Sequence, residues 1–361
     1  MKKVLMVSCE GLGNGGVQAV MMSIVRSLSS NVCFDMVLTT NERRHYDDEF
    51  ESLGGKIFRF PVPNNRLLAR LEYYLRGFRL FFGLCKIMNS DKYDAIHCHN
   101  EFYSAFCIKA AKKAGVPVRI CHTHIINSKA SRLQNSYNQI CRRMINKYAT
   151  HKIGCSEEAC KALYGVGAHS IVVNNPYDSN KFIFCAKSRS MFPVLMQIGA
   201  YSKNKNQLFS LDVVAKIKKK YPNVLFYMMG FGKGEYLTEI NKKIESLALK
   251  NNVVFYPHDA DAASILKDVD YLLFPSKKEG FGIVAIEAQS VGVRVFASDM
   301  IPKTIDCGGV VFLSLNKGAE NWANTLINDY EITRGEHKNY DCSAFCLENV
   351  MEVYQKIYEG K

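Results

Sequence analysis

The sequence predicts an α/β protein made of two Rossmann-like domains, each built on a parallel sheet. Three observations support this prediction. The chain has 361 residues, more than one ordinary hydrophobic core accommodates. Short runs rich in Val, Ile, Leu and Phe recur along it, separated by helical stretches. Several of these runs lead into glycine-rich turns, as a buried parallel strand does when a helix follows it.

The apolar runs place candidate strands in both halves of the chain. In the first half they lie at residues 4–8, 35–40, 56–60, 95–99, 118–124, 151–156 and 170–175. In the second half they lie at residues 194–199, 224–230, 253–257, 271–276, 293–298 and 310–314. We therefore expect an N-terminal domain over 1–180, a C-terminal domain over 181–345, and a helix over 346–361 that returns to the N-terminal domain. Ligands of such sheets bind beyond the carboxyl ends of the strands, here in a cleft between two facing domains.

The composition indicates a globular protein that does not span a membrane. Hydrophobic residues make up 48% of the chain and charged residues 22%. No run of about 18 apolar residues is present, and the apolar run near the N-terminus is too short for a signal peptide. The 13 cysteines are odd in number and lie mostly inside apolar runs. We expect them to be reduced core residues of a cytoplasmic protein.

The positive charge is concentrated in the first half. The net charge is +13, and no acidic residue lies between Glu101 and Glu157. Ten basic residues fall in this interval: Lys109, Lys112, Lys113, Arg119, Lys129, Arg132, Arg142, Arg143, Lys147 and Lys152. Such a field either is a solvated basic face or attracts a polyanion. Because no nucleic-acid motif accompanies it, we expect an anionic membrane surface or a lipid diphosphate rather than nucleic acid.

A second basic stretch, over residues 66–86, mixes arginines with leucines and aromatic residues. At helical spacing its apolar residues form a broad stripe. Two interpretations stay open: a core helix with arginines on its solvent-exposed face, or an interfacial helix bound to the surface of an anionic membrane.

Three glycine-rich turns follow candidate strands. The first contains Gly15 and Gly16, the second Gly199 with Lys205 downstream, and the third Gly230 and Gly232. Their spacing is not that of the dinucleotide fingerprint, and each is compatible with a plain tight turn. Together the three turns are also compatible with a site in which backbone amides near helix N-termini bind a phosphate-bearing ligand.

The most informative stretch is KKEGFGIVAIEAQ, over residues 277–289. Glu279 and Glu287 have seven residues between them and flank the tripeptide Gly280, Phe281 and Gly282. A helix that begins near Gly282 would carry Glu287 on its second turn and leave Glu279 in the preceding loop. The residues allow two interpretations. In the first, one glutamate stabilises the N-terminus of the helix and the other is solvated. In the second, the stretch binds the sugar, the diphosphate and the ribose of a nucleotide sugar.

Four histidines form two H-x-H pairs at the ends of two candidate strands. They are His97 with His99 and His122 with His124. Alternation along a strand puts each pair on one face of the sheet. Four imidazoles could bind zinc or copper, but Glu101 is the one carboxylate close to them in sequence. The other interpretation is that they are buried or face an acceptor.

Taken together, these motifs resemble the retaining glycosyltransferases of family 4, which have the GT-B fold. The E-x7-E block with its PS, GFG and EA flanks is the most specific of them. The others agree in order along nearly the whole chain: GGV at 15–17, DAIHCH at 94–99, SEEACKAL at 156–163, VVNNPYDSNKF at 172–182, GAYSKNKN at 199–206 and GFGKGEYL at 230–237. The subgroup that the chain resembles most builds bacterial capsule, exopolysaccharide or O-antigen.

The resemblance implies a role for individual residues. The catalytic residues would be His99, Glu279 and Lys205, with Lys205 neutralising the leaving diphosphate. The donor would be bound by Gly15, Gly16, Gly199, Gly230, Gly232, Gly280, Phe281, Gly282 and Glu287, the last holding the ribose. Residues on the acceptor side would be His122, His124 and Asn100. No metal and no other cofactor would be required, because the leaving phosphate helps to deprotonate the acceptor.

The resemblance also implies the substrates. The donor would be a nucleoside-diphosphate sugar, with UDP favoured, and the acceptor a glycan or a polyprenyl-diphosphate-linked glycan. The basic residues of the first half add the expectation of a cytoplasmic enzyme that is peripheral on the inner face of the membrane. One departure is that Ala200 stands where the family has an arginine, so Lys203, Lys233 or another cation would have to replace it. The alternatives are a weakly active or non-catalytic partner subunit and a basic membrane- or nucleic-acid-binding module.

Overall fold

The computed structural model describes residues 1–8, 11–13, 15–61, 69–124, 131–232 and 234–361. The chain folds into two compact units. The N-terminal unit comprises residues 1–176 and 347–361, and the C-terminal unit comprises residues 177–346. The chain therefore leaves the N-terminal unit after Pro176 and returns to it at Leu347, where the sequence had suggested boundaries at 180 and 345.

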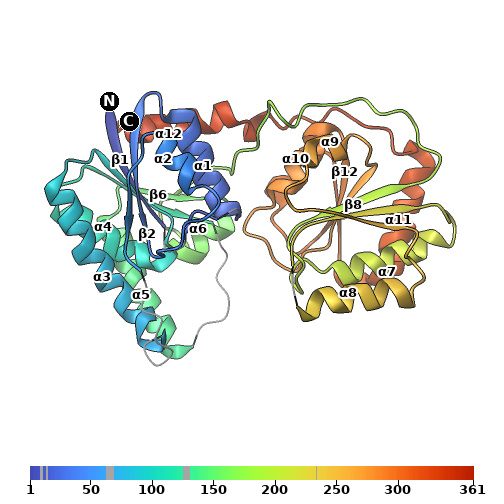
Figure 1. The fold of residues 1–361 in the computed structure, drawn as a ribbon, viewed down its shortest axis with the longest axis horizontal. Coiled ribbons are helices and arrows are strands. Elements are labelled where there is room, and N and C mark those ends of the chain that lie inside the picture. Colours follow the sequence, from blue (N-terminus) through green and yellow to red (C-terminus); the bar gives the residue numbers. More distant parts are fainter. Residues whose placement is uncertain (9–10, 14, 62–68, 125–130, 233) are drawn as a thin grey trace. The chain divides into compact units, whose positions relative to one another are not determined.

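The N-terminal unit contains a parallel sheet in the order β3-β2-β1-β4-β5-β6-β7. Its strands are β1 (Lys2–Ser8), β2 (Val32–Leu38), β3 (Ile57–Arg59), β4 (Ala95–Cys98), β5 (Val118–Thr123), β6 (His151–Gly154) and β7 (Ile171–Val172). Its helices are α1 (Gly16–Leu28), α2 (Asp47–Ser52), α3 (Ala69–Ser90), the 3-10 helix η1 (Glu101–Tyr103), α4 (Ser104–Lys113), α5 (Arg132–Tyr148), α6 (Glu157–Tyr164) and α12 (Leu347–Tyr358). Helices cover both faces of the sheet (Figure 1).

Alternate residues of each strand serve the two faces of this sheet. On β1, Val4 and Met6 pack with α1 and α12, whereas Leu5 and Val7 pack with α3, α4 and α6. Both sets are fully buried, which explains why the strand is continuously apolar in sequence. The C-terminal helix α12 is thus part of the core of the N-terminal unit.

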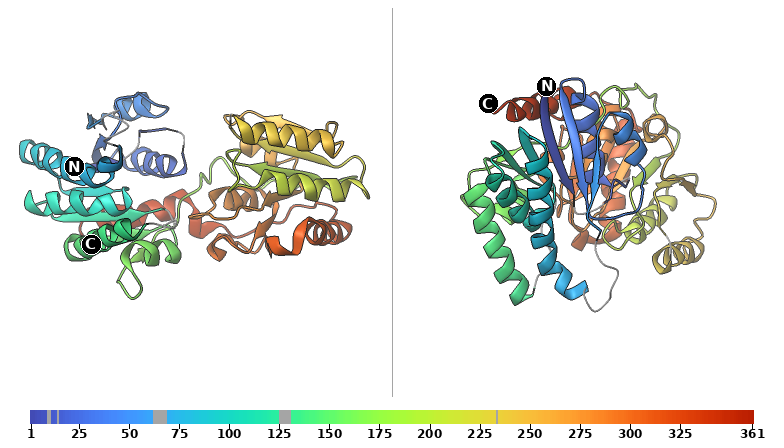
Figure 2. Two further views of the ribbon diagram at one scale, coloured as in Figure 1. Left: turned by 90° about the horizontal axis from the view of Figure 1, so that it is seen from below. Right: turned by 60° about the vertical axis from the view of Figure 1, so that its left-hand side comes forward.

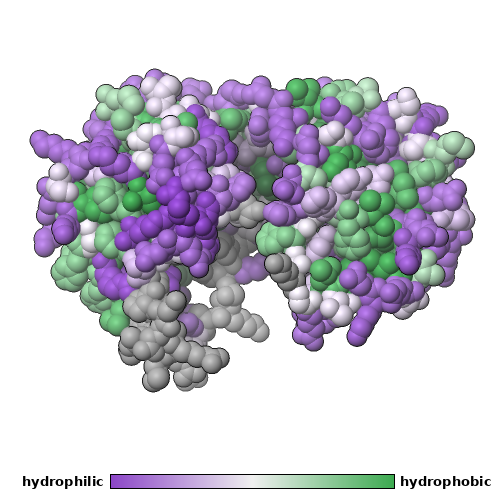
Figure 3. Space-filling model, in the orientation of Figure 1, coloured by the Kyte–Doolittle hydropathy of each residue, from purple (hydrophilic) through white to green (hydrophobic). Residues whose placement is uncertain are grey.

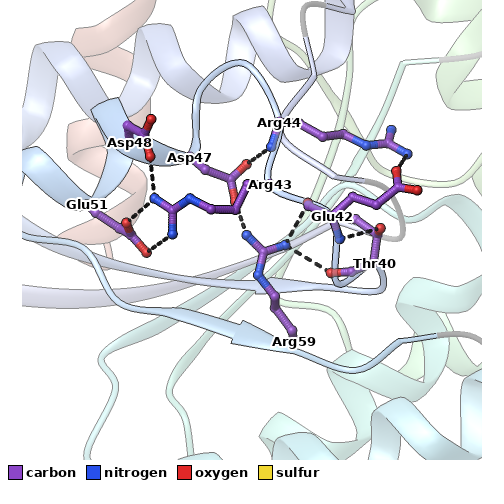
Figure 4. A network of polar contacts seen from close by, with 8 residues as sticks. All are labelled: Thr40, Glu42, Arg43, Arg44, Asp47, Asp48, Glu51 and Arg59. Atoms are coloured by element: carbon purple, nitrogen blue, oxygen red, sulfur yellow. Dashed lines mark hydrogen bonds and ion pairs between the residues drawn. The ribbon is translucent and has the colours of Figure 1, made fainter.

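A network of charged side chains holds the loop after β2 in place (Figure 4). The buried carboxylate of Asp47 pairs with Arg59 and accepts a hydrogen bond of 3.0 Å from the backbone amide of Arg44. Arg59 also donates to the carbonyl of Thr40 at 2.9 Å. The loop supports the glycine turn after β1, because the amide of Tyr46 donates to the carbonyl of Leu12 at 2.9 Å.

The C-terminal unit contains a parallel sheet in the order β10-β9-β8-β11-β12-β13. Its strands are β8 (Val194–Ile198), β9 (Leu225–Met229), β10 (Val253–Tyr256), β11 (Tyr271–Phe274), β12 (Arg294–Ser298) and β13 (Val310–Leu313). Its helices are α7 (Gln207–Lys218), α8 (Glu235–Ser246), α9 (Ala262–Leu266), α10 (Ile283–Val291), α11 (Gly318–Thr333) and the 3-10 helices η2 (Lys303–Ile305), η3 (Leu315–Lys317) and η4 (Ser343–Phe345). Figure 2 shows this unit from two further directions.

In the C-terminal unit, aromatic residues hold α11 against α7, and a buried carboxylate holds the segment before β8 against β11. Trp322 of α11 is buried against the ring of Phe209 of α7, at 5.2 Å between centroids. Asp270, just before β11, is buried and accepts hydrogen bonds of 2.7 Å from the amide of Val194 and the hydroxyl of Ser190. It also pairs with Lys187, so the segment that enters β8 is tied to β11.

The predicted α/β class with two Rossmann-like units is confirmed. The sequence predicted this strand at 35–40, whereas β2 spans Val32–Leu38. Asp35 in this strand is buried and accepts a hydrogen bond from Tyr93 at 2.7 Å. The cysteines in the described part of the chain are free thiols. In the described residues, no helix combines the length and the hydrophobicity that crossing a membrane requires.

Candidate donor and acceptor sites

Both sheets have a topological switch point, where the strand order reverses. It lies between β1 and β4 in the N-terminal unit and between β8 and β11 in the C-terminal unit. The loops that leave two such neighbouring strands diverge to opposite faces of the sheet, which opens a crevice at their carboxyl ends. The residues singled out by the sequence fall in or beside these loops.

In the C-terminal unit, hydrogen bonds join the loop after β8 to the loop after β11. The amide nitrogen of the Asn204 side chain donates to the carbonyl of Lys278 at 2.8 Å. The backbone amide of Lys277 donates in return to the carbonyl of Asn204 at 2.9 Å, and the Asn206 side chain donates to the carbonyl of Pro275 at 3.3 Å. Sequence analysis did not assign a role to either asparagine.

Lys205 and Glu279 form an ion pair across the joined loops. The Nζ atom of Lys205 lies 2.7 Å from Oε1 of Glu279. Their side chains are 22% and 13% exposed, so water screens the pair only partly. Lys205 also lies over the ring of Phe274, at 5.3 Å from its centroid. The carboxylate and the ring hold the ammonium group in one place at the edge of the sheet, where it can receive an anionic group.

The glycines of these loops allow close packing. Gly199 has a φ of 145°, and a Cβ atom there would lie 3.2 Å from Cε of Lys205. A Cβ atom on Gly230 would lie 2.1 Å from the carbonyl oxygen of Gly199, and one on Gly232 would lie 2.7 Å from Cβ of Tyr201. Packing therefore excludes side chains at Gly230 and Gly232, and the backbone conformation disfavours one at Gly199, whatever the loops bind.

Helix α10 begins as the sequence predicted, at Ile283, with Gly282 as its N-cap in the left-handed region at φ 113°. A Cβ atom on Gly282 would lie 2.9 Å from Phe274. The Phe281 side chain is buried and its ring centroid lies 5.8 Å from that of Phe345, so Phe281 offers a ligand its backbone rather than its ring.

Glu287 lies on the second turn of α10. Burial raises its pKa to about 7, with the nearby Lys181 opposing this shift and Asp178 adding to it. A carboxylate that loses water in this way is poised to accept hydrogen bonds from a ligand that replaces the water.

In the N-terminal unit, Gly15 is the N-cap of α1 and Gly16 its first residue. Both are exposed, and nothing lies within 4 Å of a Cβ atom added to Gly16. The first turn carries no acidic side chain, so its positive end is not neutralised from within the turn. This arrangement can accept an anion.

The four histidines lie together on the face of the sheet that α12 covers. His97 lies on β4 and His122 on β5, and His99 and His124 follow these strands. All four are buried. Nδ1 of His99 lies 2.9 Å from Nε2 of His124, and Nε2 of His97 lies 3.2 Å from Nδ1 of His122. Desolvation lowers the pKa of His97 to about 3 and that of His124 to about 4, so these imidazoles are neutral.

Two residues expected on the acceptor side have other surroundings. Asn100 is buried, and its side chain lies 3.9 Å from Sγ of Cys107 on α4. Glu101 follows it in a left-handed conformation, at φ 51°, and begins η1. His122 is completely buried. Contact of Asn100 and His122 with an acceptor stays a prediction.

Comparison with known proteins places the chain in a family. A family described as glycosyl transferases group 1 matches residues 178–306, and one described as glycosyl transferase 4-like domain matches residues 15–175. The chain belongs to the group 1 glycosyltransferases. Each match falls in one of the two units, and together they include Gly15, Lys205 and Glu279.

Relatives and solved structures agree with the assignment of the chain to this family. The chain is 28% identical to EpsF, a candidate glycosyltransferase of Bacillus subtilis, over 90% of this chain and 87% of EpsF. It is 24% identical to CapH, a capsular polysaccharide biosynthesis glycosyltransferase of Staphylococcus aureus, over 97% of both chains. The structure of Anabaena HepE in complex with UDP has the same fold, with a TM-score of 0.78 and 18% identity over 100% of both chains. The GT-B fold predicted from the sequence is thereby confirmed.

One cation of the family pattern is absent from this glycosyltransferase. Ala200 follows Gly199, and its neighbour Lys203 is exposed to solvent. Lys233, the other candidate for replacing the family arginine, lies outside the described residues. Lys205 is thus a partly buried cation that the described loops present at this edge of the sheet.

The raised pKa of Glu287 predicts a pH-dependent cost to stability. An unfolded glutamate ionises near pH 4.5 and the folded one near 7, so the folded state binds more protons between these values. Stability is therefore lost as the pH rises through this window. We expect Glu287→Gln to raise the melting temperature relative to the wild type at pH 8 and to change it little at pH 4.5. Thermal melts across this range test the prediction, and a constant difference at all pH values would contradict it.

Proposed function

We propose that this glycosyltransferase is a retaining hexosyltransferase that uses a nucleoside-diphosphate sugar, with UDP favoured, and extends a lipid-linked surface glycan. The observation that carries the proposal is the Lys205–Glu279 ion pair at the switch point of the C-terminal unit, with Glu287 on the adjoining helix. HepE binds UDP, and CapH is named for capsular polysaccharide biosynthesis, which supports both the donor and the product class.

The C-terminal unit supplies the groups that a nucleotide sugar needs. We assign the ribose hydroxyls to Glu287, whose desolvated carboxylate can accept two hydrogen bonds. We assign the diphosphate to Lys205 and to the backbone amides that begin α10. Glu279 orients Lys205 and lies next to the position of the sugar hydroxyls. In the transition state negative charge grows on the leaving diphosphate. A fixed ammonium group therefore stabilises the transition state more than the bound substrate.

Retention of configuration follows from attack on the face that the leaving group departs from. A bond forms between the acceptor oxygen and the anomeric carbon while the bond from that carbon to the phosphate oxygen breaks. The acceptor proton passes to the departing diphosphate. No protein nucleophile and no metal is needed for this step, and we assign His99 to the sugar and Gly15 and Gly16 to the diphosphate or the acceptor.

An exposed surface of the N-terminal unit supports a peripheral location on an anionic membrane. Helices α3, α4 and α5 pack side by side, and α3 exposes Leu75, Phe78 and Phe82 at 46%, 54% and 69%. The three helices also carry exposed basic residues: Lys86 on α3, Lys109, Lys112 and Lys113 on α4, and Arg143 and Lys147 on α5. Figure 3 shows apolar residues among hydrophilic ones on the side of this unit where α3 and α4 lie.

Helix α3 has one side in the core and another side exposed to solvent. Leu80, Leu84 and Ile87 are buried and belong to the core, whereas Phe78 and Phe82 face outward. Of the ten basic residues, Arg119 and Arg142 have structural roles, since their guanidinium groups donate to backbone carbonyls. Lys129 lies outside the described residues. We propose that the exposed lysines attract anionic headgroups while the aromatic rings enter the interface, on the cytoplasmic side.

The donor assignment predicts selective nucleotide binding. We expect calorimetry to find UDP bound more tightly than GDP or ADP, and Glu287→Ala to weaken UDP binding by about 1–3 kcal/mol, the range of hydrogen bonds to a charged group. Glu245→Ala, which removes an exposed glutamate from α8 of the same unit, is the matched control. Unchanged UDP affinity in a folded Glu287→Ala protein would rule out the ribose role, and tighter GDP or ADP binding would rule out the UDP donor.

The assignment of the sugar-facing residues makes a separate prediction. We expect His99→Ala and Glu279→Ala to slow transfer, or hydrolysis of a UDP-sugar without acceptor, by about 100-fold or more, while UDP affinity changes far less. His169→Ala, at an exposed histidine, is the control. The measurements are kcat for each variant and the dissociation constant of UDP. Near-wild-type transfer by both variants would show that the active centre lies elsewhere.

Membrane attachment is tested by flotation with liposomes. We expect recovery with anionic vesicles at low salt, less recovery at high salt, and little with neutral vesicles. Phe82→Ser should reduce recovery, whereas Ile332→Ser, which changes an 80% exposed residue on α11 of the other unit, should not. Equal recovery with neutral and anionic vesicles, or none with either, would remove the membrane from the proposal.

A further inference from the structure

The histidine cluster under α12 resembles a metal-binding site. The proposed transfer reaction needs no metal ion. One ring nitrogen from each of His97, His99 and His122 lies within 4.8 Å of the other two. Bound to one tetrahedral ion with bonds of about 2.0–2.1 Å, such nitrogens would be roughly 3.4 Å apart. To share one ion, the three nitrogens would have to come closer together than the 4.8 Å within which they now lie.

Two ring nitrogens of the proposed ligands lack a hydrogen-bond partner. Among the described residues, Nε2 of His99 and Nε2 of His122 are buried and have no hydrogen-bond partner. A buried polar atom without a partner is costly, and most buried nitrogens in proteins have one. Because desolvation keeps the rings neutral, each has a lone pair to offer.

A second layer of contacts is already present. Nδ1 of His97 lies 2.8 Å from the hydroxyl of Tyr358 on α12. Nδ1 of His99 lies 2.9 Å from His124. The ring of Tyr354 covers the cluster, with centroids 5.7 Å from His97 and 5.9 Å from His122. Metal-bound histidines commonly use their second nitrogen in this way, which fixes the tautomer and the direction of the ring.

The chemistry of the cluster selects the ion. The described carboxylate closest in sequence, on Glu101, accepts a hydrogen bond from Thr123 at 3.3 Å. Thr123 alternates with His122 and His124 along the strand and so points to the opposite face of the sheet. A set of neutral imidazoles without a carboxylate is a poor site for Mg²⁺ or Ca²⁺, which prefer oxygen ligands, and a good one for late first-row transition metals.

We propose that His97, His99 and His122 bind one Zn²⁺ or a similar late transition-metal ion, and that the ion inhibits the glycosyltransferase. The inhibition rests on the proposed function, since it requires that the ring of His99 serve the transferred sugar. An ion bound to this ring removes it from that role. The binding itself rests on the geometry of the cluster alone.

The test uses the whole protein with Co²⁺ and Zn²⁺ as probes. We expect one Co²⁺ per chain with the strong visible bands of tetrahedral nitrogen coordination, and loss of these bands when Zn²⁺ is added. His122→Gln should weaken binding at least 100-fold, Tyr358→Phe by about 10–100-fold through the lost contact to His97, and His169→Gln not at all. Zn²⁺ should also stop hydrolysis of the UDP-sugar, and a chelator should restore it.

Each outcome decides a separate point. Weak octahedral spectra with the wild-type protein, or His122→Gln binding as tightly as wild type, would overturn the metal site. Should His122→Gln not fold, the wild-type spectrum and Tyr358→Phe still decide the matter. Zn²⁺ binding that leaves hydrolysis intact would support the metal site and overturn the role of His99, whereas no hydrolysis by the metal-free protein would count against the proposed function alone.

Discussion

The parallel direction of every strand pairing within the two sheets is the constraint on which the candidate sites depend. Parallel pairing brings the carboxyl ends of neighbouring strands to one edge of a sheet. The reversal of strand order then separates the loops of β8 and β11, which face each other over a short distance. Lys205 and Glu279 are 74 residues apart in the chain, yet this topology places their side chains in contact.

The sequence predicted the parts of this arrangement that local patterns encode. Strands β8 and β11 are short, continuous apolar runs because both of their faces are covered. The start of α10 at Gly282 followed from the glycine and from the helical spacing after it. The family pattern then supplied Lys205 and Glu279 as candidates, although the ion pair between them could be recognised only once the loops were placed.

Other features depended on contacts that local patterns do not contain. The family resemblance put Asn100 on the acceptor side, but its burial and the left-handed residue Glu101 that follows it had no local sequence signal. It suggested phosphate contacts for Gly230 and Gly232, whereas the packing of Tyr201 and of the Gly199 carbonyl already requires glycine there. The hydroxyl of Tyr358 beside His97, 261 residues away, had no sequence signal at all.

Helix α12 has a consequence for the order in which the protein is made. On the ribosome, its residues emerge only after the whole C-terminal unit, which at about 5–20 residues per second delays them by roughly ten to thirty seconds. During that interval the N-terminal unit lacks Tyr354, Ile357 and Tyr358 of its core, and the face of its central strands that α1 and α12 share is only partly covered. The C-terminal unit is one continuous segment of the chain, so no part of its core is delayed in this way. The C-terminal unit can therefore complete its core before the N-terminal unit does.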